Sequence, residues 1–290
     1  MSLAWRKLPQ GWMLFDEARR KCVLGVGYHW YRPWLYPLFT PCSHQVLQEY
    51  AFDHPFHNGC FVGLHPVVHE GRHHNFWATP PQRQEHDPFL ADLGRVVLQP
   101  STIFKAEAHS AFARLNLNWQ GADGVLLLTE TREYRVIAGA EFNQVSMTCR
   151  LTAQQNIQLP ATKFAGIGIR VAPELTPGLN ARFGRMMSLD AGSAPFTRRG
   201  REKSFLPSPL EEMHGESAHG IWTESAHDGR GFGLYVCAQE PQVPWFARGY
   251  GLFLHNPLQR HGRDLIAGEE LTWCLTLGAY DRGPIPREVM

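Results

Sequence analysis

Histidines are concentrated between residues 53 and 77, where residues 53–59 read Asp-His-Pro-Phe-His-Asn-Gly. Imidazole rings exchange protons near neutral pH, and an adjacent carboxylate can fix which ring nitrogen carries the proton. We therefore expect His54 and His57 to act as general acid or base, or to bind ligand hydroxyl groups. Asp53, Asn75 and Trp77 are expected to contact the same ligand.

A metal site is the alternative for these histidines. The His-x-x-His spacing of His54 and His57 can bring two imidazoles to one divalent cation, although the spacing fixes no third ligand. Pro55 keeps His54 out of the helical region of backbone conformation, so the segment is expected to be a structured turn. No cofactor is required by the sequence, and a divalent metal, if present, would be bound by these two histidines.

Two charged residues share the face of an apolar strand. Glu130 and Arg132 have the same parity as Leu128 and Tyr134 in a sequence that alternates like a β-strand. One interpretation is a buried ion pair between Glu130 and Arg132. The other is a catalytic carboxylate that faces a cavity, with a pKa adjusted by burial. The sequence leaves both open.

Further cations and rings are candidates for binding the ligand. Lys163 has the parity of Ile167 and is expected to point inward, which suits an anionic or carbonyl ligand, with a buried ion pair as the alternative. Arg32 stands among aromatic residues and suits a hydroxylated or acidic ligand. The last candidates, found in one glycine-containing run, are Trp245, Arg248 and Tyr250. The aromatic residues of this run can equally belong to the core.

The elements that must position these residues are β-strands. Runs of five to ten residues alternate between apolar and polar and end at Gly, Pro or Asn, which is typical of antiparallel sheets. Val145, Met147, Cys149 and Leu151 form one such face. Other expected strands lie at Trp12–Phe15, Cys22–Tyr28, Cys60–Val68, Val96–Phe104, Phe112–Trp119, Lys163–Val171 and Gly251–Leu254. A short helix is expected near 173–183 and a long exposed loop at 191–217. The fold class is therefore all-β, a large antiparallel sandwich with few short helices.

Composition limits the class of protein further. The chain has 290 residues, a net charge of +1 and 43% hydrophobic residues, as expected for one globular domain spanning 1–290. A balanced charge provides no field for nucleic acid, and no apolar run is long enough to cross a membrane. The N-terminus does not read as a signal peptide and the six cysteines lack a close pair, so we expect free thiols and a cytoplasmic location. The oligomeric state is not indicated.

Several short motifs, taken together, resemble one family. They are Arg32-Pro33, Tyr36-Pro37-Leu38, Asp53-His54-Pro55, His57-Asn58-Gly59, Asn75-Phe76-Trp77, Thr129-Glu130, Thr162-Lys163, Trp245-Phe246-Ala247-Arg248, Tyr250-Gly251, Asn256-Pro257 and Gly268-Glu269-Glu270-Leu271. In these the sequence resembles the bacterial DUF6807 family, often labelled methane oxygenase PmoA, whose members look like the galactose-mutarotase supersandwich. The oxygenase label does not suit a chain without membrane-spanning segments. The resemblance implies a small-molecule carbohydrate ligand.

Three functions follow as hypotheses. The first is a sugar epimerase, isomerase or lyase in which Glu130 and a histidine are base and acid, cations hold oxygens, and Trp77 and Trp245 contact the sugar ring. The second is a carbohydrate-binding or accessory protein without catalysis. The third is a metal-dependent enzyme built on the histidines.

Overall fold

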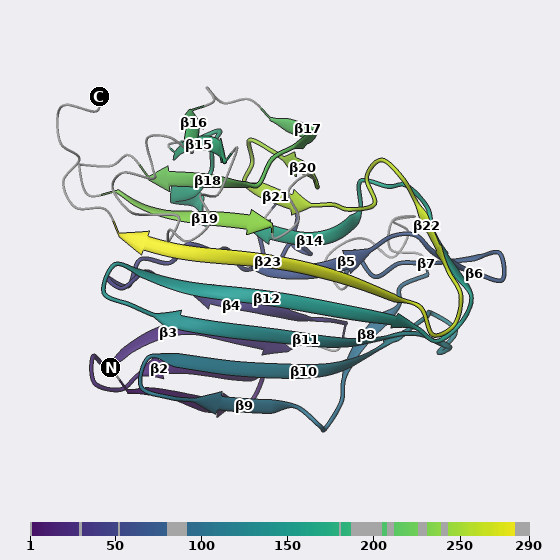
Figure 1. Ribbon diagram of the computed structural model, residues 1–290, viewed down its shortest axis with the longest axis horizontal. Coiled ribbons are helices and arrows are strands. Elements are labelled where there is room, and N and C mark those ends of the chain that lie inside the picture. The colour runs from purple at the N-terminus through teal and green to yellow at the C-terminus, as the bar shows by residue number, and fades with distance from the viewer. Residues whose placement is uncertain are drawn as a thin grey trace.

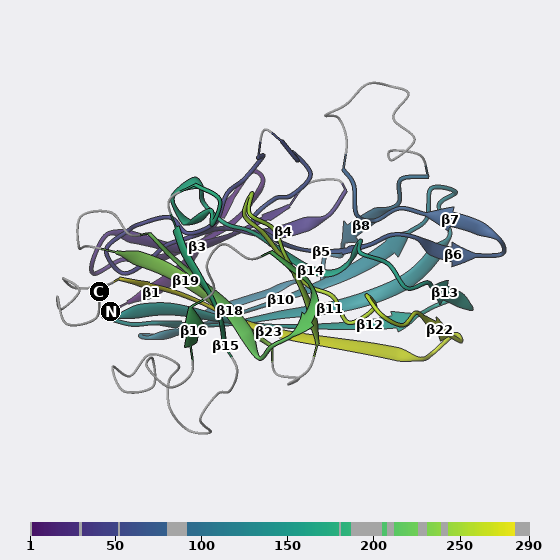
Figure 2. The ribbon, with the colours of Figure 1, turned by 90° about the horizontal axis from the view of Figure 1, so that it is seen from above.

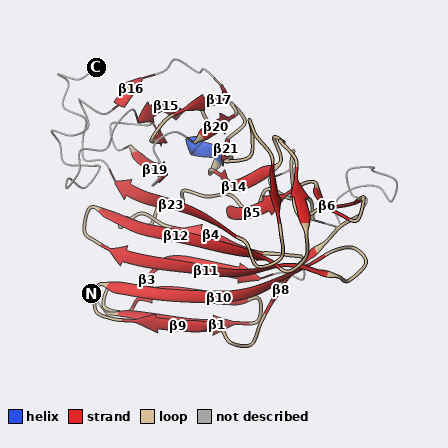
Figure 3. Ribbon diagram, turned by 45° about the vertical axis from the view of Figure 1, so that its right-hand side comes forward, coloured by secondary structure: helices blue, strands red, loops and turns tan. Residues whose placement is uncertain are grey.

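The computed structural model describes residues 2–28, 31–51, 53–79, 92–179, 181–186, 205–207, 212–225, 231–238 and 243–281. Within these ranges the chain is almost entirely β-structure, and its helical content is one 3-10 segment, η2 (Pro173–Leu175) (Figure 3). No helix in this part of the chain is long and apolar enough to span a membrane.

The strands form three antiparallel sheets (Figure 1). The first has nine strands in the order β1 (Leu3–Leu8), β2 (Gly11–Asp16), β3 (Lys21–Tyr28), β4 (Pro33–Leu38), β5 (Cys60–Leu64), β14 (Ala165–Arg170), β21 (Leu252–His255), β20 (Pro244–Ala247) and β17 (Met213–Ser217). The second has ten: β16 (Phe205–Pro207), β15 (Ala181–Met186), β18 (Gly220–Ser225), β19 (Phe232–Ala238), β23 (Glu270–Asp281), β12 (Phe142–Ala153), β11 (Leu126–Ala138), β10 (Ser110–Gln120) and β8 (Arg95–Leu98), with β9 (Ile103–Ala106) also paired to β10. The third has four: β22 (Arg263–Leu265), β13 (Ile157–Leu159), β6 (Val67–His69) and β7 (Arg72–His74).

The long strands of the second sheet follow the alternation in the sequence. Val145, Met147, Cys149 and Leu151 of β12 are all buried, as the pattern predicts, and the residues between them face outward. An irregularity in the β10–β11 register near Trp119 is the exception. It places both Leu127 and Leu128 in the core, at 0% exposure, so strict alternation does not hold there.

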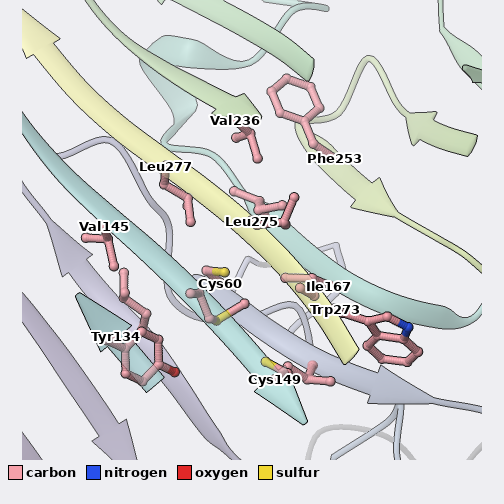
Figure 4. Packing of buried hydrophobic residues seen from close by; sticks show 14 of the residues in the cluster. Cys60, Tyr134, Val145, Cys149, Ile167, Val236, Phe253, Trp273, Leu275 and Leu277 are labelled. Carbon is pink, nitrogen blue, oxygen red and sulfur yellow. The ribbon is translucent and has the colours of Figure 1, made fainter. Parts of the chain in front are cut away.

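The core lies between the first and second sheets, which Figure 2 shows one above the other. In the close view of Figure 4, Ile167 and Phe253 from the first sheet and Tyr134, Leu275 and Leu277 from the second belong to one packed cluster. Each fully buried aliphatic side chain contributes about 1.5–3 kcal/mol relative to an exposed one. The all-β antiparallel sandwich predicted from the sequence is confirmed.

Local predictions are corrected where turns interrupt the pattern. The expected helix at 173–183 is only η2, because Pro177-Gly178 ends it and β15 begins at Ala181. The expected strand Cys60–Val68 is two strands of different sheets, β5 and β6. In the expected loop at 191–217, residues 205–207 and 213–217 are strands, and residues 191–204 and 208–211 lie outside the described part of the chain.

Candidate functional site

The turn that leads into β5 carries His54 and His57, the two histidines predicted to act as general acid or base. The His54 N–H donates to the carbonyl oxygen of Ala51 at 3.2 Å, and the His57 N–H donates to that of His54 at 2.9 Å. Gly59 follows with a φ of 53°, and a Cβ there would lie 2.2 Å from the carbonyl oxygen of Leu35 in β4. Only glycine fits this close approach, so Gly59 fixes where the turn joins the sheet.

Asp53 connects this turn to the neighbouring strand β14. Its Oδ1 accepts a hydrogen bond of 2.7 Å from Nη2 of Arg170, and its Oδ2 lies 2.9 Å from Nδ1 of His54. Nε of Arg170 donates in turn to Oε1 of Gln48 at 3.4 Å. The buried arginine therefore anchors the carboxylate that orients His54.

The charge of Asp53 determines what His54 can do. Burial raises the pKa of Asp53, but the hydrogen bond from His54 and the positive charge of Arg170 outweigh burial, so the pKa lies below its ordinary value. An ionised carboxylate accepts hydrogen bonds only, so Nδ1 of His54 is the donor. Nε2 is then the ring nitrogen that can exchange a proton with a ligand. The His54 side chain is 38% exposed, so a ligand can reach it.

A column of aromatic rings, ending in a guanidinium group, runs through His54 from the surface into the core. The ring of Tyr250 lies 4.9 Å from that of His54, which lies 5.0 Å from that of His57, with nearly parallel planes. His57 lies 5.6 Å from Phe61, and the guanidinium of Arg32 lies 4.0 Å from the Phe61 ring centre. This column holds the His54 ring in one orientation, which general acid-base catalysis requires.

His57 is a neutral packing residue. Its burial, followed by the positive charges of His54, Arg32 and Arg170, lowers its pKa well below 6.5. The planes of His54 and His57 differ by only 6°, and imidazole lone pairs lie in the ring plane, so two stacked rings do not point at one ion. Among the described residues no group of three or more His, Cys, Asp or Glu side chains could hold a metal ion. The geometry gives no support to the metal alternative.

Two arginines, each paired with a carboxylate, lie near the exposed end of the column. The guanidinium carbons of Arg170 and Arg248 lie 5.0 and 5.9 Å from the Tyr250 ring centre. Arg248 is paired with Glu212, and its Nε lies 3.1 Å from Oε1 of the carboxylate. The same Oε1 accepts a hydrogen bond of 3.0 Å from the Gly249 N–H. Guanidinium groups so placed suit a carboxylate or a developing oxyanion.

Glu130 lies in the core, where its carboxylate is paired with Arg132. Nε and Nη2 of Arg132 donate to its two oxygens at 2.6 and 2.8 Å, and Nε1 of Trp119 donates to Oε2 at 2.9 Å. The side chains of Glu130 and Arg132 are both 0% exposed. The structure therefore contains the buried ion pair, which was one of the two interpretations of these charges.

Four other predicted ligand contacts support the fold around the site. Arg32 is 2% exposed and donates to the carbonyl oxygens of Phe56 and Trp77, so it ties the turn to the segment after β7. Oδ1 of Asn75 accepts the N–H groups of residues 77 and 78. Trp77 and Trp245 are 1% and 0% exposed, and Nε1 of Trp245 donates to a backbone carbonyl oxygen. Their rings belong to the interior.

The prediction that Lys163 points inward is wrong. Strand β14 begins at Ala165, so the alternation that places Ile167 in the core does not extend back to residue 163. Lys163 is exposed, and its Nζ lies 5.2 Å from the ring centre of Phe164. It can contribute positive charge at the surface without a buried partner.

The sequence did not identify Arg170, Gln48 or Glu212 as site residues. Arg170 carries a usable signal, because it is the one charged residue of β14 and its parity is opposite to that of Ile167 and Ile169. Gln48 and Glu212 lie outside regular alternation, and only the folded chain brings them to this place.

These features define an all-β antiparallel sandwich with a carboxylate–histidine pair at the edge of a cationic cluster. A model for the DUF6807 family, a family of unknown function, matches residues 26–288. The chain belongs to this family, as its motifs predicted. No curated protein matches it in sequence.

Solved structures give a distant resemblance. A galactose 1-epimerase from Lactobacillus acidophilus matches 97% of this chain and 99% of its own, with 10% identity and a TM-score of 0.47. A galactose mutarotase related enzyme from the same organism matches 97% and 98%, with 9% identity and a TM-score of 0.42. A GH36 α-galactosidase from Geobacillus stearothermophilus matches 97% of this chain and 41% of its own, with 9% identity and a TM-score of 0.47.

Proposed function

We propose that this protein binds a sugar or sugar acid at the turn of Asp53 and His54, and that His54 exchanges a proton with it. The observation that supports this is the fixed pair itself. Asp53 is anchored by Arg170 at 2.7 Å and holds Nδ1 of His54 at 2.9 Å, so Nε2 is the ring nitrogen left for the ligand. An oriented imidazole of this kind contributes roughly 10²–10⁴-fold to proton transfer.

The surrounding groups favour an oxygen-rich ligand. Arg170 and Arg248 can hold a carboxylate or carbonyl oxygen. Burial raises the pKa of Tyr250, so its phenol keeps its proton at neutral pH and can donate a hydrogen bond. An epimerase, isomerase or lyase needs this combination: a base for a C–H beside a carbonyl, and donors for the oxyanion that results.

Proton exchange into solvent is the direct test. The protein is incubated in D₂O with glucuronate, galacturonate, gluconate, 2-keto-gluconate, fructose or galactose, and deuterium incorporation at carbon is followed by NMR. We expect at least one compound to exchange, and His54→Gln to abolish exchange while the protein remains folded. His261→Gln, at an exposed histidine, is the matched control and should leave exchange unchanged. Exchange that survives His54→Gln would contradict the proposal.

A binding protein without turnover is the second candidate. It is favoured by the position of Glu130, because the carboxylate predicted as the second proton-transfer group is bound to Arg132 and Trp119 in the core. Titration calorimetry with the same compounds separates the two functions. Binding that Arg170→Gln and Arg248→Gln weaken, with no deuterium exchange for any compound, would favour the binding protein.

A further inference from the structure

A groove lies beside the candidate site and takes no part in the chemistry proposed above. It has a volume of about 520 Å³ and is lined by Tyr36, His44, Gln45, Gln48, Glu49 and Phe232, together with residues that follow β14. Sites for small organic ligands have roughly this size, about 300–1,000 Å³. The groove can therefore hold a ring-sized group.

Gln48 and Arg170 connect the groove to the carboxylate–histidine pair. Gln48 lines the groove, and its Oε1 accepts a hydrogen bond from Nε of Arg170, whose Nη2 binds Asp53. The backbone fixes the same contact, because the Gln48 N–H donates to the Arg170 carbonyl oxygen at 2.9 Å. A ligand held by Arg170 could therefore extend past Gln48 into the groove.

Two carboxylates and an amide oxygen supply hydrogen-bond acceptors to the groove. Oε1 of Glu49 accepts the indole N–H of Trp34 at 2.9 Å, and Glu174 adds a second, exposed carboxylate to the lining. Nε2 of Gln45 donates to the Tyr36 hydroxyl at 2.7 Å. The amide oxygen of Gln45, Oε1, therefore remains to accept a hydrogen bond from a ligand. Neither Lys nor Arg is found among the described residues that line the groove. Such a surface selects a partner that supplies many O–H donors.

The groove also has a flat wall. The rings of His44 and Phe232 are stacked at 4.5 Å with planes 7° apart, and both residues line the groove. Flat ring faces pack on the C–H face of a sugar ring while its hydroxyl groups reach polar neighbours. Tyr50 follows Glu49 in the sequence and precedes the turn of Asp53 and His54. Its side chain is 45% exposed, and its φ of 52° is rare for an aromatic residue.

We infer that this groove is a second subsite, which takes a neutral, hydroxyl-rich sugar ring attached to the unit held at Arg170 and His54. The inference depends on the proposed function, because it assigns the first unit to that site. It specifies the ligand class as an oligosaccharide or glycoside with an acidic end at Arg170 and a neutral end at Glu49. Hydroxyl groups that donate to ionised carboxylates form the stronger class of hydrogen bond.

Calorimetry with paired probes tests the second subsite. The probes are gluconate with lactobionate, in which a galactose ring is attached to gluconate, and glucuronate with an aldobiouronic acid, in which a neutral sugar is attached to glucuronate. We expect the two-unit probe of at least one pair to bind about tenfold or more tightly than its one-unit partner. Glu49→Gln and Glu174→Gln should remove most of that gain and leave the one-unit affinity unchanged. Glu270→Gln, at an exposed carboxylate on β23, is the matched control.

The two hypotheses fail in different ways. Equal affinity for one-unit and two-unit probes, or a gain that Glu49→Gln and Glu174→Gln leave intact, would overturn the second subsite and leave the proposed function standing. If no probe binds with an affinity that Arg170→Gln reduces, the proposed function fails and the second subsite fails with it. Melting temperatures of all variants show whether any loss comes from unfolding.

Discussion

Oδ1 of Asp53 lies 2.7 Å from Nη2 of Arg170, and this contact joins a turn to a strand more than a hundred residues later in the chain. The Arg170 side chain is 6% exposed and that of Asp53 is 23% exposed, so the pair is shielded from water on one side. Removing the carboxylate leaves a largely buried guanidinium without its charged partner, which is costly. The contact should therefore matter for stability as well as for the orientation of His54.

We expect Asp53→Asn to lower the free energy of unfolding by about 2 kcal/mol, because an amide cannot balance the charge of Arg170. Urea denaturation measures this change. Asp264→Asn, at an exposed aspartate of β22, is the control and should stay within about 0.5 kcal/mol of the unmodified protein. Equal values for the two variants would show that the Asp53–Arg170 contact does not stabilise the fold.

For the buried pair of Glu130 and Arg132, we expect a single variant to destabilise the fold and a double variant to restore most of the stability. Glu130→Gln leaves Arg132, at 0% exposure, with an unbalanced charge, and we expect a loss of about 3–5 kcal/mol. The double variant Glu130→Leu, Arg132→Met removes both charges and should recover most of that loss. Guanidinium denaturation of the three proteins checks this. A double variant less stable than Glu130→Gln would contradict the prediction.

Tyr250 should stabilise the fold through its ring more than through its hydroxyl group. Its face contacts His54 at 4.9 Å on one side and Arg170 at 5.0 Å from the ring centre. Stacking and cation–π contacts of this kind contribute about 1 kcal/mol. We expect Tyr250→Phe to keep the thermal stability and Tyr250→Ala to lose about 1–2 kcal/mol. If Tyr250→Phe loses as much as Tyr250→Ala, the hydroxyl group is the important part.

The sequence predicted the sheet structure well where alternation is long and uninterrupted. The buried face of Val145, Met147, Cys149 and Leu151 in β12 is an example, because period-two patterning follows directly from strand geometry. The same rule failed at Lys163, since it was applied two residues before β14 begins. Strand ends are set by turns and partner strands, which a pattern of residue types does not specify.

The candidate site was predicted in part. Asp53 and His54 are adjacent in sequence, so their hydrogen bond could be anticipated from spacing alone. Arg170 and Tyr250 reach the same place through the order of β5, β14, β21 and β20 in one sheet, and this long-range order was not available from residue types. Glu130 was a candidate because charge on a buried face is unusual, but a local partner two residues away satisfied it.

The burial of His255 leads to a prediction of how the free energy of unfolding depends on pH. It is 2% exposed, packs against Trp245 at a ring distance of 5.4 Å, and neither ring nitrogen has a hydrogen-bond partner among the described residues. Burial lowers its pKa from 6.5 to about 3. In the unfolded chain the imidazole takes up a proton below about pH 6.5, whereas the folded protein does not until about pH 3.

Because the unfolded state binds the extra proton, this histidine makes the folded protein less stable as the pH falls from 6.5 towards 3. One proton changes the free energy of unfolding by about 1.4 kcal/mol per pH unit once the unfolded imidazole is fully charged. We expect His255→Phe to flatten the dependence between pH 6 and pH 4 by roughly 2 kcal/mol relative to the unmodified protein, measured by urea denaturation at a series of pH values. His261→Phe, at an exposed histidine, should keep the original slope. An unchanged slope in His255→Phe would mean that the folded protein accommodates a charged imidazole at this position.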